Sequence, residues 1–302
     1  MLKRLRRNYQ LVLLVLPITV YFVVVNYLPM PGLYLAFTDY KFPKGIFGSP
    51  FVGLENFRYV FEAGVMSRLV RNTILYNIAF YFVNLGLQVG AAVFLSFMHS
   101  KMAKKVMQQI ILLPHFLSFV FVGTIAYNLL STDIGTVNGV IQRFGGAPVQ
   151  FYTRRDLWPF LIVGFNAWKT VGYGSVIYLA ALAGVSPEIY ESADIDGASV
   201  AQKIRYITLP GIASTIVILM LFAVGQMLFG QFELFQNLVG NIGPLYATTD
   251  IIETFIFRQI TTTFNIGLGS AMDLFKSTFG FLLILVVNTI TKRVSRGEHR
   301  LF

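Results

Sequence analysis

The chain has 302 residues, of which 55% are hydrophobic and only 13% are charged, and its mean hydropathy is +0.65. Because a soluble domain keeps roughly a quarter of its residues charged, this composition excludes an ordinary soluble protein and favours one that faces lipid. Cysteine is absent, which excludes disulfides, thiolate catalysis and cysteine-based metal sites. The net charge of +10 does not indicate a nucleic-acid partner, because Lys and Arg lie in short segments between apolar runs, where they orient a membrane protein.

Long apolar stretches organise the chain. A helix that crosses the hydrocarbon core needs about 20 apolar residues, and six segments meet this need. In chain order, the predicted spans are 10–31, 73–98, 107–130, 157–185, 206–229 and 270–291. We therefore expect an all-α integral membrane protein in which residues 1–302 form one transmembrane domain.

The first apolar stretch follows basic residues, as a signal peptide does. Pro29, Met30 and Pro31 stand where a small-residue cleavage site would be needed, so we expect the first helix to be retained. The inner connections are shorter than the outer ones and denser in Lys and Arg if both termini are cytoplasmic. The segment 231–268 is then an outer loop, part of which is expected to dip back.

One inner connection, residues 186–205, differs from the other polar loops and is named here the coupling loop. Its sequence predicts two short helices, with Ser186 as a cap, Pro187 in the first turn and Gly197 at the break. After the glycine, apolar residues recur at helical spacing, so the second helix is expected to be amphipathic and to lie at the membrane surface. Pro210 predicts a bend or a helix start where this helix enters the fifth span.

The coupling loop resembles the signature loop, or EAA motif, of ABC importer permeases. The match runs from Glu191-Ser192-Ala193 through Gly197 to Ile207-Thr208-Leu209-Pro210, and Ser192 stands where the family usually has alanine. Three further segments resemble the oligosaccharide and polysaccharide permeases of type I importers, which are maltose-permease-like. They are Phe51-Val52-Gly53-Leu54-Glu55-Asn56-Phe57, Trp168-Lys169-Thr170-Val171-Gly172-Tyr173 and Tyr178-Leu179-Ala180-Ala181-Leu182.

This resemblance implies a type I permease fold in the bacterial cytoplasmic membrane. It also implies a second, homologous permease subunit, two ABC ATPase subunits and an external solute-binding protein that delivers a sugar. ATP and magnesium would be bound by the ATPase subunits, and the chain itself has no G-x-x-x-x-G-K-[ST] loop for phosphates. We therefore expect neither enzymatic activity nor a cofactor in this chain. The resemblance implies that the helix 187–196 docks into the ATPase, with Glu188, Glu191, Ala193, Asp194, Asp196 and Gly197 as coupling residues.

Several polar residues lie inside predicted spans. A charge at the depth of Lys169 is costly, so this side chain either lines the sugar path or pairs with a carboxylate such as Asp273. Amides and tyrosines within spans serve either as hydrogen-bonded links between helices or as sugar ligands, with aromatic faces for ring stacking. The candidates for the substrate path are Asn84, Asn166, Trp168, Lys169, Tyr173 and Gln226.

Two other classes of transporter stay open. An ion-coupled secondary transporter should show internal halves and acidic residues within its spans, whereas the acids here gather in the coupling loop. An ABC permease for a non-sugar solute would share the coupling loop. His99, His115 and His299 fall on separate segments, so no metal site is expected. The charge of Lys169 hints weakly at acidic sugars.

Overall fold

The computed structural model describes residues 9–62 and 64–294, and within these ranges it is helical, with a single isolated β-bridge between Thr38 and Phe51. The N-terminal and C-terminal basic residues that enter the orientation rule, Lys3 to Arg7 and Arg296 and Arg300, lie outside the described part. Internal contacts divide the chain into two compact units. Unit 1 comprises Met1–Val65 and Ile256–Phe275, and unit 2 comprises Met66–Phe255 and Lys276–Phe302.

Unit 1 begins with an apolar helix and continues into short helical turns. Its elements are α2 (Tyr9–Asn26), the 3₁₀ helices η1 (Met30–Phe37) and η2 (Phe42–Lys44), α3 (Gly45–Gly48) and α4 (Glu55–Glu62). Asn56 at the start of α4 donates hydrogen bonds of 3.0 Å to the carbonyl oxygens of Ala36 and Thr38. A Cβ on Gly267 would lie 2.4 Å from the Thr38 oxygen, so a glycine is needed where α17 passes this turn.

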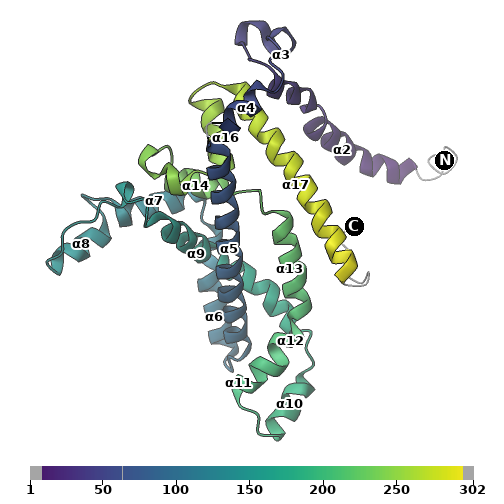
Figure 1. Ribbon diagram of the computed structural model, residues 1–302. Coiled ribbons are helices and arrows are strands. Elements are labelled where there is room, and N and C mark those ends of the chain that lie inside the picture. Colours follow the sequence, from purple (N-terminus) through teal and green to yellow (C-terminus); the bar gives the residue numbers. More distant parts are fainter. Residues whose placement is uncertain (1–8, 63, 295–302) are drawn as a thin grey trace. The chain divides into compact units, whose positions relative to one another are not determined.

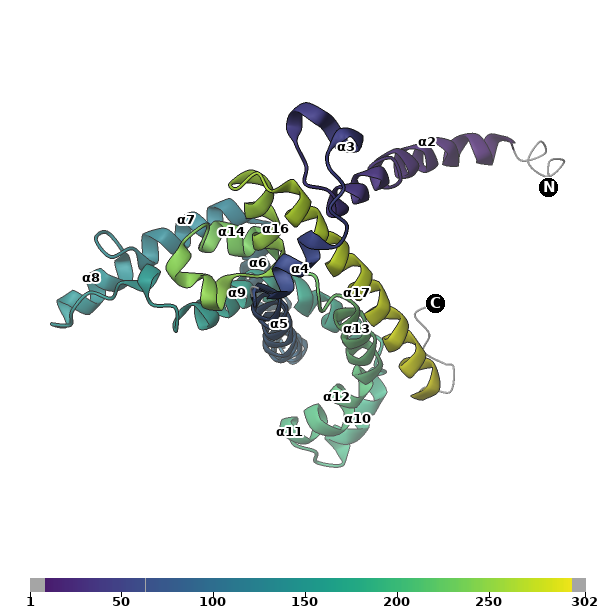
Figure 2. The same cartoon turned by 45° about the horizontal axis from the view of Figure 1, so that its top comes forward.

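Unit 2 contains most of the helices (Figures 1 and 2). Its N-terminal half holds α5 (Val65–Ser96), α6 (Lys101–Leu112), η3 (Leu113–Phe116), α7 (Phe119–Leu130), α8 (Thr136–Arg143), η4 (Phe151–Thr153) and α9 (Trp158–Leu182). Next come α10 (Pro187–Ile195), α11 (Val200–Lys203), the π turn η5 (Ile204–Thr208), α12 (Leu209–Gly211) and α13 (Ala213–Gly225). The last elements are α14 (Phe232–Leu238), η6 (Gly243–Leu245), α15 (Tyr246–Thr249), α16 (Ile252–Thr261) and α17 (Ile266–Val294). The two units share α16 and α17, because Ile256–Phe275 belongs to unit 1.

Three stretches of the described chain are single helices long and apolar enough to cross a membrane, and the number rises to six if each bent helix pair counts as one span. The predicted spans 10–31, 73–98 and 270–291 fall in the three single helices. The predicted span 107–130 is not straight, because the chain turns by 96° between η3 and α7. The predicted span 206–229 is broken by 55° after Gly211, directly beyond Pro210, and its helix ends at Gly225.

The main apolar core of unit 2 packs α14 against α5, α7 and α9. Phe235 of α14 is 1% exposed and lies edge-on to Tyr76, with ring centroids 4.7 Å apart. Trp158, at the start of α9, is fully buried in the same cluster. Figures 1 and 2 both draw α14 beside α7. The segment after Gln231, expected as an outer loop that partly dips back, therefore enters the helix bundle and supplies part of its core.

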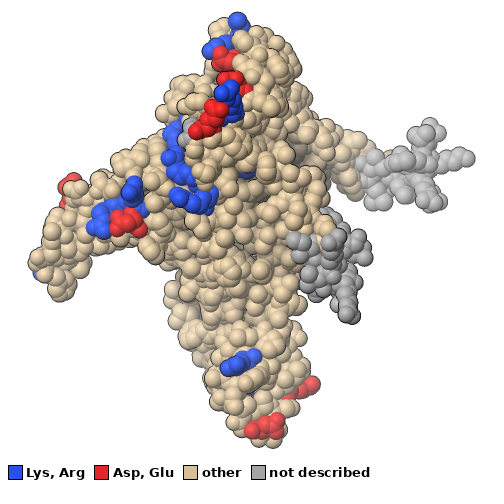
Figure 3. Space-filling view, viewed as in Figure 1, with Lys and Arg blue, Asp and Glu red and all other residues tan. Residues whose placement is uncertain are grey.

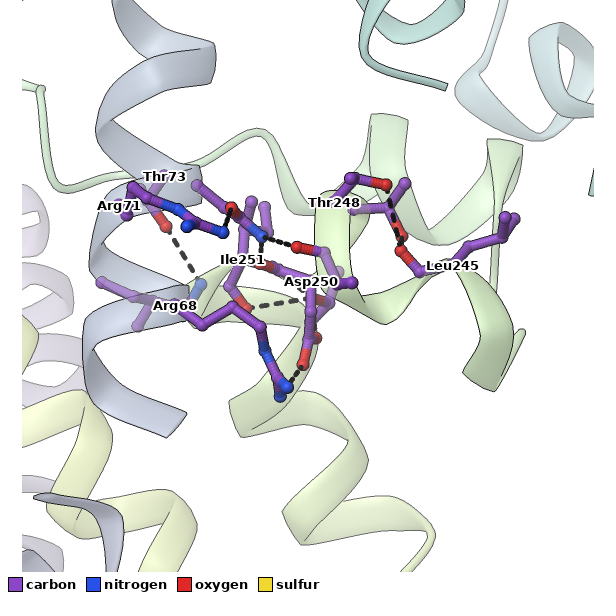
Figure 4. Close-up of polar contacts among 12 residues, drawn as sticks. Arg68, Arg71, Thr73, Leu245, Thr248, Asp250 and Ile251 are labelled. Carbon is purple, nitrogen blue, oxygen red and sulfur yellow. Dashed lines mark hydrogen bonds and ion pairs between the residues drawn. The ribbon is translucent and has the colours of Figure 1, made fainter. Parts of the chain in front are cut away.

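Polar side chains of α5 hold the turn between α15 and α16. Asn72 donates to the carbonyl oxygens of Asp250, at 3.0 Å, and Ala247, at 3.3 Å. The Asp250 carboxylate is buried and lies 3.5 Å from the Arg68 guanidinium, and Thr73 accepts a hydrogen bond from the Ile252 amide (Figure 4). Because a buried carboxylate is tolerated only with partners, this set of bonds fixes the turn against α5.

Asn138 of α8 fixes the connection between α7 and α9. Its side chain is 1% exposed, donates to the carbonyl oxygens of Ser131 (3.1 Å) and Val149 (2.9 Å), and accepts from the Val149 amide (2.7 Å). One amide side chain thus closes a loop of irregular backbone.

We predict that Asn138→Ala lowers the stability of the protein by about 2 kcal/mol, because the Val149 amide loses its hydrogen-bond partner and the carbonyl oxygens of Ser131 and Val149 each lose one of two donors. The measurement is the thermal unfolding temperature in detergent. The matched control is Asn128→Ala, since exposed Asn128 makes only a local bond of 2.9 Å to the Thr124 carbonyl oxygen. Equal melting temperatures for the two variants would show that the loop does not depend on Asn138.

Candidate functional site

The coupling loop forms two helices, as the sequence predicts. Gly197 separates α10 from α11 and has a φ of 72°, a left-handed conformation that glycine adopts without strain. The amide of Ala198 donates to the carbonyl oxygen of Ala193 at 2.8 Å, which closes the end of α10. Ser199 and Gln202 form a reciprocal capping box at the start of α11. This pair is a further local signal for the start of the second helix.

The prediction that Ser186 caps α10 holds for its position but is wrong for its side chain. Ser186 occupies the position before α10 and Pro187 is the first helical residue, but the Ser186 hydroxyl makes no capping bond to a backbone amide. It donates instead to the Glu188 carboxylate at 3.2 Å. The first turn of α10 therefore relies on Pro187, which lacks an amide hydrogen, and on Glu188 near the positive end of the helix.

The outer surface of α10 is acidic and apolar at once. Glu188, Glu191, Asp194 and Asp196 are exposed, and Ile195 is 87% exposed. Lys203 of α11 pairs with Asp194. Red acidic atoms mark this end of unit 2 in Figure 3, and the surface next to it on that face carries few charges. The exposed face of α10 therefore combines negative charge with an apolar side chain.

Tyr190 connects α10 to the rest of unit 2. Its ring lies edge-on to Phe97, which follows α5, with centroids 6.2 Å apart. Its hydroxyl is 3.0 Å from the hydroxyl of buried Thr208 in the π turn. Tyr190 thus joins α10 by direct contacts to the residue that follows α5 and to the π turn that precedes α12.

A second feature is a pocket of about 340 Å³ between α5, α9, α13 and the η3 turn, named here the amide pocket. Of the six residues predicted for the substrate path, Asn84, Tyr173 and Gln226 line it. Sequence reasoning missed other polar residues of its wall. These are Asn77, Tyr81, Gln88, His115, Thr170 and Tyr178. No Lys, Arg, Asp or Glu lines the amide pocket.

The amide pocket has an ordered wall. The Asn84 side chain donates to Asn166 at 2.8 Å and accepts from the Thr170 hydroxyl at 3.1 Å. Asn166 is 1% exposed and donates to Gln231 at 2.7 Å, so the structure places it behind the pocket as a link between helices. His115 stacks on Tyr173 with centroids 4.3 Å apart, which gives the pocket a flat aromatic face.

Lys169 does not line the amide pocket. The residue is 6% exposed, and its ammonium donates to the backbone carbonyl oxygens of His115, at 3.0 Å, and Leu117. These carbonyls lie where the helix breaks between η3 and α7. The ammonium is thus bonded to backbone oxygens that the break leaves without helical partners.

Trp168 also lies away from the amide pocket. It lines a separate apolar hollow with Phe160, Phe165 and three aliphatic residues of α7 and α9. Trp168 is 39% exposed there, and this environment is typical of a side chain that packs against lipid or another helix. Ring stacking in the amide pocket is thus left to Tyr173 and His115.

The comparisons with known proteins agree with this architecture. No family model matches the chain. The chain is 31% identical over 305 residues to the polygalacturonan/rhamnogalacturonan transport system permease protein YteP of Bacillus subtilis (strain 168), with 100% of this chain and 92% of that protein covered. The chain belongs to the permease subunits of carbohydrate ABC importers. Permeases of this family are subunits of ABC importers.

Solved structures support the same assignment for this permease. A bacterial ABC transporter involved in the import of the acidic polysaccharide alginate contains a chain with a TM-score of 0.86 and 29% identity, covering 97% of this permease and 98% of that chain. The alginate transporter in complex with an alginate pentasaccharide-bound periplasmic protein matches with the same TM-score and identity, over 99% of both chains. The permease therefore has the helical fold of ABC importer permeases.

We predict that Lys169→Met lowers the thermal stability of the permease by about 2–4 kcal/mol, because two buried carbonyl oxygens lose their donor. Lys44→Met, the same change at an exposed position, serves as the control and should have no effect. Melting in detergent and sugar uptake are measured together. Normal stability with altered sugar affinity would assign Lys169 to the substrate path instead.

Proposed function

We propose that this permease takes up an oligosaccharide or polysaccharide that an external solute-binding protein delivers. It pairs with a homologous permease, and two ABC ATPase subunits bind ATP and magnesium below the pair. Three single helices and one span from each bent pair give six crossings with both termini in the cytoplasm; α9 is the fourth crossing, and α10 lies on the cytoplasmic side after it. The relatives support the substrate class, since YteP is named for polygalacturonan and rhamnogalacturonan and the matched solved transporter imports alginate.

The coupling loop connects the permease to the ATPase in this proposal. The observation that carries it is the acidic, partly apolar surface of α10, tied through Tyr190 to Phe97 and Thr208. Glu188 and Glu191 face a basic surface of the ATPase, and Ala193, Asp194, Asp196 and Gly197 keep the helix and its turn in shape. Closure of the ATPase pair then moves α10, and Tyr190 passes this movement to α5 and to the start of α13.

The amide pocket is part of the sugar path. Asn84, Tyr173 and Gln226 offer neutral donors and acceptors, and the stacked rings of Tyr173 and His115 offer a flat surface for a sugar ring. α5, α9 and α13 all contribute to its wall, so a movement passed along α5 and α13 changes its shape. This link supports alternating access by the rocking of two permease subunits.

We predict that Glu191→Lys and Gly197→Pro each reduce sugar uptake at least tenfold without preventing membrane insertion. The first variant reverses the charge of an exposed residue on α10, and the second cannot adopt a φ of 72° because proline holds φ near about −65°. Uptake of radiolabelled sugar and ATP hydrolysis are measured on the assembled importer.

The matched control is Glu62→Lys, which reverses an exposed carboxylate on α4 that pairs with Arg58. This variant should transport normally, because α4 lies in unit 1 and not in the coupling loop. Wild-type uptake in both coupling-loop variants would overturn the assignment of residues 186–205 to the ATPase.

A further inference from the structure

A second polar hollow of about 500 Å³ lies at the C-terminal end of α7 and is named here the tyrosine groove. Its walls are the end of α7 with the turn that follows it, Tyr152 of η4, and α14 with its C-terminal turn. The lining residues that carry polar side chains are Tyr127, Ser131, Thr132, Asp133, Tyr152, Gln236 and Asn237. Its volume falls within the range of small-molecule sites.

Two polar atoms of the groove wall have no protein partner. The Ser131 hydroxyl oxygen and the Gln236 side-chain oxygen are buried and make no hydrogen bond to any residue that the structure describes. Ser131 is only 5% exposed, and its backbone amide and carbonyl already have partners. A buried polar atom without a partner costs free energy, so its occurrence in the wall of a hollow indicates a bound group that completes it.

Two aromatic rings flank these atoms. The Tyr127 and Tyr152 centroids are 6.1 Å apart with an interplanar angle of 49°. Tyr152 is held from behind by buried Trp158, 5.1 Å away, and Trp158 is fixed by a bond of 2.9 Å from its indole nitrogen to the Phe151 carbonyl oxygen. Burial and the neighbouring Tyr127 both raise the pKa of Tyr152, so its hydroxyl remains neutral and can both donate and accept.

The groove is ordered before any ligand arrives. Asn138 holds the Ser131 backbone, and a Cβ on Gly123 would lie 2.3 Å from the Asn237 carbonyl oxygen, so α7 and α14 are in direct contact along the groove floor. A wall that is fixed in advance loses little entropy when a ligand binds.

The groove and the coupling loop lie at opposite ends of α9. Trp158 at the first residue of α9 supports the groove, and the last residue, Leu182, leads into α10. The 25 residues of α9 correspond to about 37 Å at 1.5 Å per residue. If α10 faces the cytoplasm, the groove therefore opens on the outer side of the permease, where an incoming sugar is first met.

We propose that the tyrosine groove is an entry subsite that binds one uncharged sugar residue of the incoming saccharide. The sugar ring packs one face against the adjoining rings of Tyr127 and Tyr152, and Ser131 and Gln236 bond to its hydroxyl groups. Asp133 is the charged residue of the lining, and no Lys or Arg contributes to it, so a uronate ring is disfavoured. The proposal rests on the proposed function, since it assumes a saccharide substrate.

The test uses the assembled importer in lipid nanodiscs without its binding protein. Maltotetraose and arabinotetraose are the neutral probes and tetragalacturonate is the charged one, and dissociation constants are measured by titration calorimetry. Wild type should bind at least one neutral probe more tightly than tetragalacturonate. The double variant Ser131→Ala/Gln236→Leu should bind that probe about tenfold more weakly or worse, with an unchanged or higher melting temperature, because neither side chain loses a protein hydrogen bond.

Two further variants test whether the effect is specific to the groove and whether its charge sets the preference. Gln142→Leu makes the same change on exposed α8, outside the groove, and should bind as wild type does. Asp133→Lys should shift the preference toward tetragalacturonate. Unchanged affinity in the double variant, or tighter binding of tetragalacturonate by wild type, would overturn the entry subsite while leaving the importer function intact. Failure of wild type to transport any saccharide with its binding protein would overturn both.

Discussion

The fold depends on how unit 2 satisfies the backbone groups that its broken helices release. Inside a membrane, each unpaired carbonyl or amide costs several kcal/mol, so a helix can break only where another group bonds to the freed backbone. The Lys169 ammonium does this at the break before α7, and Asn77 does it for the Met227 and Phe229 carbonyl oxygens after α13, at 2.9 and 3.2 Å. Asn72 and Tyr76 do the same for the turn around Asp250. Some of the polar residues within the spans therefore serve to bond backbone groups at helix breaks. Only the polar residues that also line a pocket are available to bind a sugar.

The amide pocket and the coupling loop share the same helices. The helices that carry the amide pocket are the ones whose ends contact the coupling loop, through Tyr190 on one side and the π turn with Pro210 on the other. A π turn accommodates an extra residue within a helix and is frequent at functional positions. Because the bonds at these breaks are made by side chains, the helical segments on either side keep regular geometry despite the bend between them.

Local signals in the sequence are sufficient to predict the two helices of the coupling loop. Pro187, Gly197 and the acidic first turn act within a few residues of one another, and span lengths follow from hydropathy. The break before α7 had local signals too, namely Pro114 and the capping residue Ser118, but an uninterrupted apolar run outweighed them. The partners of Asn166 and Lys169 could not be predicted, since Gln231 is 65 residues from Asn166 and the His115 carbonyl is 54 residues from Lys169. Such pairs depend on helix crossings, and hydropathy carries no information about which helices cross.

The triplet Gly172-Tyr173-Gly174 on α9 has a consequence for how such permeases diverge. A methyl group at position 172 would lie 1.9 Å from the Ile111 carbonyl oxygen, and one at 174 would collide with the Gln88 side chain. Tyr173 between them is 54% exposed toward the amide pocket. A side chain at either glycine therefore meets a neighbouring helix, whereas a change of Tyr173 first alters the wall of the amide pocket and its stack on His115. Substitutions are accommodated more easily at position 173 than at position 172, where the obstacle is backbone.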